Sequence, residues 1–325
     1  MNVGFRSLRE QGPGPAWNAV FQAGWPGWRQ WFLERGGAQA PSLTDATRAV
    51  RRFMPEMEGL WSGLVAAVPS DEDVARFLSF WTPPRYLVHC SQAVLVDAEG
   101  PILVRNYDLA PELNEGTLLR SRWRSRDVIG MVDGLSGLAD GMNDAGLVVS
   151  LTFGGRAVAG RGFGAPMIVR YLLEVCSDTY QAVEALRSVP CHMAYNVTVL
   201  DRQGRSETVY LSPDRPAIVS GKAFTTNHQL GVEWPRHGRL SRTVQRAETL
   251  ERILADPGLD GAGLAAAFLT PPLLATSYAQ GFGTVYTACY RPAAGAVTLL
   301  WPGQAARHWT FQDYGQIEFQ VSYPD

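Results

Sequence analysis

The sequence predicts an α+β fold in which antiparallel sheets are covered by helices, with a helical extension at the N-terminus. Three observations support this prediction. Alternating apolar and polar residues form strand pairs joined by short turns, helical patterns are grouped between these pairs, and the first 89 residues are helical in pattern and rich in tryptophan. A doubly wound fold would instead alternate single strands with single helices.

Residues 1–89 form the expected helical prefix. The stretches TDATRAVRRFMPEMEGLWSGLV and DEDVARFLSFW have helix-like spacing of apolar residues. Pro83 and Pro84 then break the helical pattern, and strand patterns follow. We therefore expect one domain at 90–325, with the prefix packed against it. The prefix tryptophans that would be buried in this contact are Trp17, Trp25, Trp28, Trp31, Trp61 and Trp81.

Three strand pairs follow the prefix. RYLVHCSQAVLV and PILVRNYD flank a turn at 97–100, YNVTVL and RSETVYLS flank one at 201–204, and GTVYTACY and AVTLLW flank one at 292–295. The helical stretches between them are APMIVRYLLEVC, DTYQAVEALRS and LSRTVQRAETLERILAD, with Asp178 as an N-cap of the second.

Composition and charge exclude several classes of protein. Of the 325 residues, 46% are hydrophobic and 18% charged, and the net charge of -2 provides no field for nucleic acid or an anionic membrane. No segment has the length and apolarity of a membrane span, and the four cysteines lack CxxC spacing. The histidines are dispersed, so we expect no metal and no cofactor. A reduced, cytoplasmic protein fits these features best.

Cys90 has the most informative setting in the chain. If the first turn is centred between residues 98 and 99, Cys90 lies across from Tyr107, and the neighbouring strand brings Arg105, Asn106 and Asp108 beside it. A guanidinium next to a cysteine favours the thiolate. Alternatively, Cys90 is a small buried hydrophobe, and Arg105 and Asp108 form an ion pair at the end of a hairpin.

The segment HCSQAVLVDAEGPILVRNYDL resembles the start of the mature chain in the cysteine N-terminal nucleophile hydrolases. This is the superfamily of choloylglycine hydrolase and penicillin V acylase, and the likeness is strongest to its acyl-coenzyme A:6-aminopenicillanate acyltransferase branch. Three further blocks resemble the family in the same order, so the resemblance covers about 90 to 303. They are DGMNDAGLVVSLTFGG, FTTNHQ and GTVYTACYRPAAGAVTLLWPG. The resemblance implies a four-layer αββα sandwich.

The resemblance also implies roles for particular residues. A precursor would cleave itself between His89 and Cys90, and the freed α-amine of Cys90 would then serve as general base for its own thiol. Asp108 would orient this amine, Arg105 would favour the thiolate and place the substrate, and the side chain of Asn227 would donate to the oxyanion.

Several positions depart from the family pattern or complete it. Thr152 stands where other branches have an asparagine near the oxyanion, so either Thr152 or backbone NH groups supply the second donor. Arg242, in LSRTVQR, is a candidate for a later arginine near the nucleophile, and Asn106 and Tyr107 are candidates for contact with substrate. His89 occupies a cleavage position where a small residue is expected.

Three hypotheses of function follow. The first is an amidohydrolase that cleaves a linear non-peptide amide through a thioester on Cys90, and the second is an acyltransferase that passes the same acyl group to an amine. The third is an inactive relative that acts as a binding protein. A papain-like protease is disfavoured because no C-G-S-C-W-like segment is present. The expected partner is a small-molecule amide or acyl donor. The two fragments would be held together as a heterodimer. The sequence leaves open whether the protein also forms a homo-oligomer.

Overall fold

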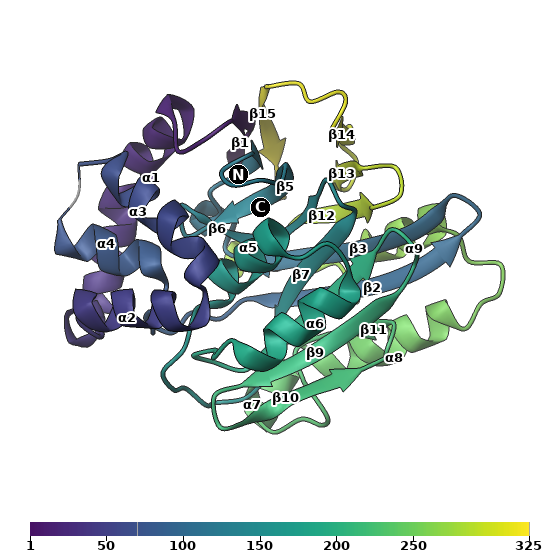
Figure 1. Ribbon diagram of the computed structural model, residues 1–325. Helices are drawn as coiled ribbons and strands as arrows, with labels where there is room; N and C mark the ends of the chain where they lie inside the picture. Colours follow the sequence, from purple (N-terminus) through teal and green to yellow (C-terminus); the bar gives the residue numbers. More distant parts are fainter. Residues whose placement is uncertain (70, 325) are drawn as a thin grey trace.

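The structure, a computed structural model, describes residues 1–69 and 71–324. Ser70 and Asp325, which belong to the expected 1–89 and 90–325 parts, lie outside the described residues. Two β-sheets lie face to face at the centre of the molecule (Figure 1). The larger has nine strands, which in spatial order are β10 (Arg215–Ser220), β9 (Ser206–Ser212), β8 (Tyr195–Asp201), β7 (Leu147–Phe153), β6 (Gly137–Asn143), β5 (Val128–Asp133), β4 (Thr117–Ser121), β1 (Asn2–Glu10) and β15 (Glu318–Ser322).

The second sheet contains the segment around Cys90. Its six strands in order are β11 (Phe224–Thr225), β2 (His89–Asp97), β3 (Gly100–Leu109), β12 (Gly283–Arg291), β13 (Ala296–Leu300) and β14 (Arg307–Thr310). The turn between β2 and β3 is tight because Gly100 has a φ of 102°, and the Asp97 side chain accepts from the Glu99 NH at 2.9 Å.

Helices cover both outer faces of the sandwich, which confirms the predicted αββα arrangement. The helices α5 (Ala165–Val175) and α6 (Thr179–Ser188) pack on the nine-stranded sheet, and α8 (Thr243–Leu254) and α9 (Gly261–Phe268) pack on the six-stranded sheet. A short helix, α7 (Pro235–Leu240), precedes α8. Asp178 caps α6 as expected, since its carboxylate accepts from the Gln181 NH at 2.9 Å.

The helices of the prefix lie at one end of the sandwich, on the left in Figure 1. It contains α1 (Pro15–Glu34), α2 (Leu43–Phe53), α3 (Glu58–Ala66) and α4 (Glu72–Ser79). Trp17 is 1% exposed, its Nε1 donates to the Leu135 carbonyl at 2.8 Å, and its ring meets Trp123 edge-on. The prefix therefore shares one hydrophobic core with the sheets.

The prefix is not helical throughout, because its first residues form strand β1. This strand pairs parallel with β4 and antiparallel with β15, so the sheets are also not antiparallel at every pair. A parallel pair needs a long crossover, and here the whole prefix and the first hairpin separate β1 from β4. Phe5 and Ser7 are buried in an alternating pattern that is too short to stand out in the sequence.

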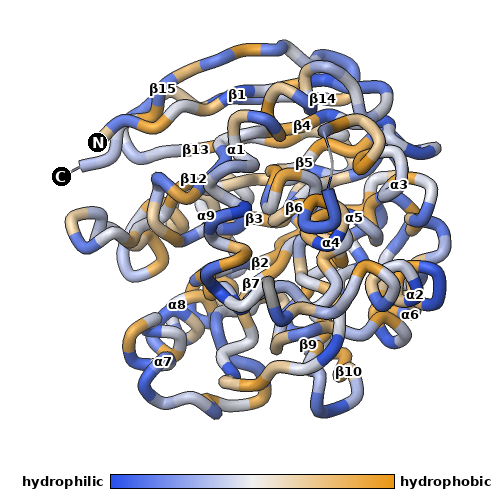
Figure 2. Tube along the Cα trace, turned by 90° about the vertical axis from the view of Figure 1, so that its left-hand side faces the viewer, coloured by the Kyte–Doolittle hydropathy of each residue, from blue (hydrophilic) through white to orange (hydrophobic). Residues whose placement is uncertain are grey.

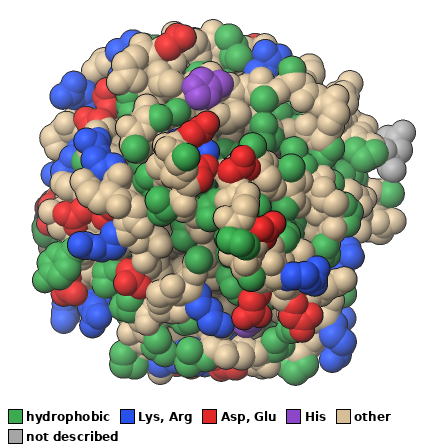
Figure 3. Space-filling view, turned by 90° about the vertical axis from the view of Figure 1, so that its right-hand side faces the viewer, with side chains coloured by type: hydrophobic (Ala, Val, Ile, Leu, Met, Phe, Trp, Pro, Cys, Tyr) green, Lys and Arg blue, Asp and Glu red, His purple; other side chains and the backbone are tan. Residues whose placement is uncertain are grey.

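The apolarity of the helices and the distribution of surface charge bear on which partners the protein can bind. No helix in the described part of the chain is long and apolar enough to cross a membrane, and polar residues interrupt the apolar ones along the helices in Figure 2. On the face shown in Figure 3, basic and acidic side chains are interspersed.

Candidate active site around Cys90

Cys90 lies at the start of β2, and its side chain is completely buried. The strand register places it opposite Tyr107, as the turn position predicts, with Arg105 and Asp108 close by on the same neighbouring strand. The β2–β3 pair lies inside the six-stranded sheet and faces the other sheet, where the Gln92 amide donates to Thr198 at 2.6 Å.

Arg105 is the cation in direct contact with the nucleophile candidate. Its Nη2 donates to the Sγ of Cys90 at 3.1 Å, and its Nη1 forms an ion pair with Asp140 at 2.7 Å. Tyr286 donates to Asp140 at 2.6 Å and Tyr290 also donates to it, so the carboxylate is fully engaged. The guanidinium is thereby fixed in one orientation toward the sulfur.

A second arginine, Arg246 on α8, contacts the backbone of the nucleophile candidate. Its Nη1 donates to the Cys90 carbonyl at 2.6 Å and to Ser91 Oγ at 2.7 Å, while its Nη2 donates to Asn227 Oδ1 at 2.6 Å. Asp108 lies 3.9 Å from the same guanidinium. Sequence reasoning missed Arg246, although an arginine on the buried face of an amphipathic helix, one turn before Leu250, was a usable signal.

Arg242, the arginine expected near the nucleophile, is exposed at the N-terminus of α8 with a φ of 48°. The structure places Arg246 there instead. Arg242 is the N-cap residue and has a left-handed backbone, so it lies outside the helix, whereas Arg246 lies within it on the buried face.

Asn227 is held in one orientation by this arginine. A guanidinium can only donate, so Arg246 fixes Oδ1 toward itself, and the NH of Cys90 also donates to this oxygen at 3.2 Å. The amide nitrogen then faces backbone carbonyls, with Phe153 O at 3.1 Å and Val88 O at 3.5 Å. Its donor is thus directed at the chain just before the bond between residues 89 and 90.

Asp108 is buried beside both of these groups. Thr284, on strand β12, donates to its carboxylate at 2.7 Å. Burial raises the pKa of Asp108 to about 6, although Arg246 and the Thr284 hydroxyl act in the opposite direction. The carboxyl group therefore titrates near neutral pH.

The expectation that Cys90 is a thiolate does not hold for the uncut chain. Burial raises the pKa of the Cys90 thiol to about 12, and this effect outweighs the stabilising influence of Arg105. The guanidinium is already paired with Asp140, so it provides less net positive charge to the sulfur than the sequence suggests.

Two of the other candidate residues have their polar atoms engaged away from Cys90. Asn106 donates to the carbonyls of Phe268 and Leu273 at 2.8 and 3.1 Å, and it accepts from Thr287. Thr152 donates to the Thr226 carbonyl at 3.0 Å. Asn106 thus fixes the chain after α9, and Thr152 fixes the residue before Asn227.

His89 and Tyr107 line a cavity of about 960 Å³ next to Cys90. The His89 ring meets the rings of His237 and Phe282 edge-on, with centroids 4.8 and 4.7 Å apart. Burial lowers the pKa of His89 to about 3, so its imidazole is neutral at physiological pH. The prefix forms a large part of the cavity wall through α1 and through residues 85–89.

The described residues include no group of three or more His, Cys, Asp or Glu side chains that could hold a metal ion.

Comparisons with known proteins identify the family of the chain. A model of the family described as acyl-coenzyme A:6-aminopenicillanic acid acyl-transferase matches residues 96–306. The search against curated proteins gives no match.

Three solved structures are similar to the chain. A mutant of the conjugated bile acid hydrolase from Clostridium perfringens is 13% identical, with a TM-score of 0.50 over 72% of this chain and 97% of that one. Penicillin V acylase from Agrobacterium tumefaciens is 13% identical, with a TM-score of 0.47 over 69% and 86%. The N-acylethanolamine-hydrolyzing acid amidase ortholog from Caenorhabditis elegans is 15% identical, with a TM-score of 0.45 over 72% and 100%.

The sandwich of two sheets covered by helices is thus the fold of the conjugated bile acid hydrolase. Because the family model matches more than half of the sequence, the chain belongs to the acyl-coenzyme A:6-aminopenicillanic acid acyl-transferase family. The family and the similar structures are named as acyltransferases, hydrolases, acylases and amidases.

The two arginines on and before α8 give a matched test of this site. We expect Arg246→Ala to lower the free energy of unfolding by about 3 kcal/mol, because buried Asp108 and Asn227 lose their partner. Arg242→Ala should change it by no more than about 0.5 kcal/mol. Urea unfolding measures both, and equal effects of the two variants would contradict the assigned contacts.

Proposed function

We propose that this protein is a self-activated cysteine amidohydrolase that cleaves a linear, non-peptide amide through a thioester on Cys90. The observation that carries this proposal is the placement of Cys90 between two buried guanidinium groups, with the Asn227 amide nitrogen directed at the chain before it. The membership in a family of acyl-transferring enzymes supports it.

Self-cleavage would begin with the thiol of Cys90. Its sulfur attacks the carbonyl carbon of His89, the bond to the nitrogen of Cys90 breaks, and this nitrogen takes a proton and becomes a free α-amine. Water then hydrolyses the thioester, leaving a carboxylate on His89 and a thiol on Cys90. Asp108 would accept the thiol proton in the uncut chain, since its raised pKa makes it a stronger base than an ordinary carboxylate.

Turnover of an amide would use the same groups with the new amine as base. The α-amine of Cys90 takes the thiol proton, and the sulfur attacks the amide carbonyl. The tetrahedral intermediate collapses as the leaving amine receives the proton, which gives an acyl thioester that water hydrolyses. Asp108 would hold the protonated amine, and Arg105 would stabilise the thiolate.

Asn227 would supply one donor to the oxyanion. Its amide nitrogen lies 3.5 Å from the Val88 carbonyl, so the donor already faces the main chain next to the reacting bond. The Thr152 hydroxyl donates to the Thr226 carbonyl, so the second donor is assigned to a backbone NH group. Arg246 is a positioning residue that fixes the orientation of the Asn227 amide.

Intact mass under denaturing conditions tests self-activation. We expect two fragments, residues 1–89 and 90–325, from the native sequence and one uncut chain from Cys90→Ala, whose amidase activity should fall by about 10³-fold or more. A single uncut chain in both proteins would overturn self-activation. If Cys90 also failed to react with a thiol-directed probe, the binding-protein hypothesis would replace the enzyme.

The pH dependence of self-cleavage tests the role of Asp108. Because the carboxylate form accepts the proton and its pKa is raised to about 6, the rate of cleavage should rise between pH 5 and pH 7 with a midpoint near 6. Asp108→Asn should cleave slowly and lose this midpoint. A profile that is unchanged in the variant would assign the base to another group.

Acyl transfer is the second candidate, and the name of the matching family favours it. Water and an amine compete for the same thioester, so product analysis with an added amine separates the two. We expect the carboxylic acid to remain the main product at millimolar amine. A main product in which the acyl group is attached to the added amine would identify a transferase.

A further inference from the structure

His89 has a side chain that takes no part in the steps above. The residue precedes the bond that Cys90 would cleave, at a position where a small residue is expected. Its half-buried ring meets the rings of His237 and Phe282 edge-on, with centroids 4.8 and 4.7 Å apart. His237 lies on α7 and Phe282 directly precedes β12, so two segments far apart in the chain meet at this one side chain.

His237 is itself enclosed by aromatic rings. It is 4% exposed, its ring stacks on that of Trp234 with centroids 5.2 Å apart, and it meets the Phe153 ring edge-on at 5.0 Å. Neither of its ring nitrogens has a hydrogen-bond partner in the described part of the chain, and the same holds for Nδ1 of His89. The two imidazoles therefore contact their surroundings as aromatic rings, and edge-on pairs of such rings attract one another.

Both imidazoles are uncharged at physiological pH. Burial lowers the pKa of His237 to about 4 and that of His89 to about 3, and the charge of Arg246 acts in the same direction on both. Two imidazolium ions in contact would repel one another, whereas two neutral rings pack. The contact is therefore one between neutral rings across the pH range of the self-cleavage test.

The two rings that contact His89 are fixed by their own backbones. The carbonyl of His237 accepts from the NH of Ser241 and from its hydroxyl, both at 2.9 Å. The NH of Phe282 donates to the Ser277 carbonyl at 3.1 Å, directly after Gly281, whose φ of 69° turns the chain there. Rings on a backbone held in this way can hold a third ring in one place.

Polar contacts hold the chain on either side of the bond between residues 89 and 90, and they leave the His89 side chain to the rings. The Cys90 NH donates to Asn227 Oδ1 at 3.2 Å, and Arg246 donates to the Cys90 carbonyl at 2.6 Å. The Asn227 amide nitrogen lies 3.5 Å from the Val88 carbonyl. A rotation of His89 between these points would turn its carbonyl relative to the sulfur, and a small error in the position of a reacting group costs a large factor in rate.

We propose that His237 and Phe282 are positioning residues for self-cleavage, whose rings form an aromatic clamp on the His89 side chain and keep the His89 carbonyl in place for attack by the Cys90 sulfur. The imidazole of His89 is then a requirement of this chain, because a small residue in its place would leave the clamp empty. This assignment rests on the proposed function, since it concerns the bond that Cys90 is proposed to cleave.

The experiment measures the rate of self-cleavage of the full chain made by cell-free translation. Translation is stopped, the fraction of uncut chain is followed on denaturing gels, and the fragments are identified by mass. We expect His89→Ala and His237→Ala to slow cleavage about tenfold or more, because the reacting carbonyl is no longer held in place. His89→Phe and His237→Phe should keep at least about a third of the native rate, because they retain an aromatic ring at the contact.

The double variant His89→Ala/His237→Ala tests whether the two rings act through one contact. Its rate should match that of the slower single variant within about twofold, whereas independent effects would multiply and would overturn the clamp. Urea unfolding in the Cys90→Ala background, in which every variant stays uncut, shows which variants fold. If His237→Ala does not fold, His89→Ala decides the matter, because His89 is only half-buried.

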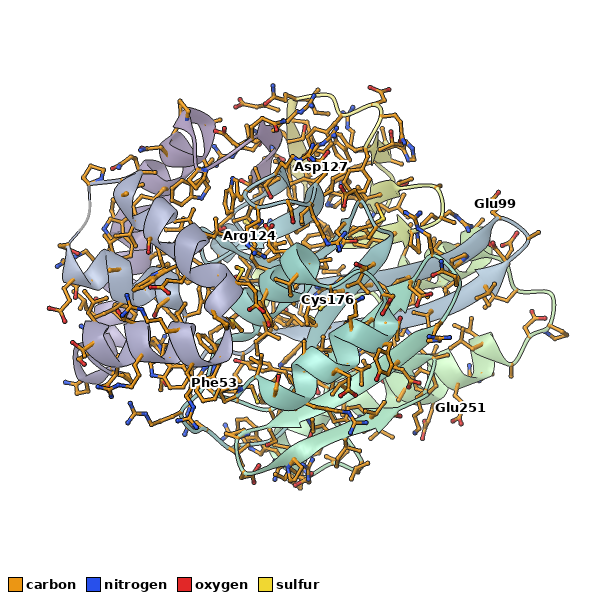
Figure 4. All side chains as sticks on the ribbon, in the orientation of Figure 1. Phe53, Glu99, Arg124, Asp127, Cys176 and Glu251 are labelled. Atoms are coloured by element: carbon orange, nitrogen blue, oxygen red, sulfur yellow. The ribbon has the colours of Figure 1, made fainter. Side chains whose placement is uncertain are left out.

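Two control variants leave the clamp intact. His308→Ala removes an exposed imidazole on β14, which lies at the opposite end of the molecule from α7 (Figure 1). Glu251→Ala removes an exposed side chain on α8, on the side of the molecule away from the prefix (Figure 4). Both should cleave at the native rate within about twofold, because neither side chain contacts the bond or the rings that hold it.

The outcomes separate this proposal from the one on which it rests. If His89→Ala cleaves as fast as the native chain or faster, as a preference for a small residue before the nucleophile predicts, the clamp is wrong and the self-activated hydrolase stands. The clamp is also wrong if the phenylalanine variants are as slow as the alanine variants. If the native chain itself stays uncut, the proposed function fails and the clamp has no bond to position.

Discussion

The ion pair between Arg105 and Asp140 is the interaction on which the arrangement around Cys90 depends. Both side chains are 0% exposed, and hydrogen bonds to the remaining groups offset the cost of burying such a pair. Tyr286 and Tyr290 donate to the carboxylate, and the Ala139 carbonyl accepts from Nη1 of the arginine at 2.8 Å, while its Nε has no hydrogen-bond partner in the described part of the chain. Since Arg105 lies on β3 and Asp140 on β6, the pair joins the two sheets and fixes the distance between them.

Arg246 is the second arginine at Cys90, and it contacts different atoms from those that Arg105 contacts. Arg105 contacts the sulfur of Cys90, whereas Arg246 contacts its carbonyl and sets the Asn227 amide. In the uncut chain, burial still keeps the thiol protonated. Cleavage before Cys90 would therefore change two things at once: it would create an amine next to the sulfur, and it would free the segment that separates the sulfur from the cavity.

The strand patterns were sufficient to predict the part of the site that depends on local register. A two-residue turn centre fixes every pair of a hairpin, so the position of Cys90 opposite Tyr107 followed from the sequence. The hydrogen-bond partners of Asn106 and Thr152 could not be predicted, because they come from segments 44 or more residues away. Arg246 was missed for a related reason: which of Arg242 and Arg246 lies on the buried helix face depends on where α8 begins.

The prefix was expected to be a helical piece that remains attached to the sandwich, and its contacts give it a larger part in the site. Trp17 binds α1 to the core through Leu135, two residues after Asp133. On the same helix, the Trp28 indole NH donates to Glu115, and the Trp31 ring meets the Tyr86 ring edge-on. A cleaved prefix that left the sandwich would remove one wall of the cavity, whereas one that stays bound keeps it. Buried Trp17 therefore anchors the prefix to the core, and the half-buried Trp28 and Trp31 form part of the wall of the cavity.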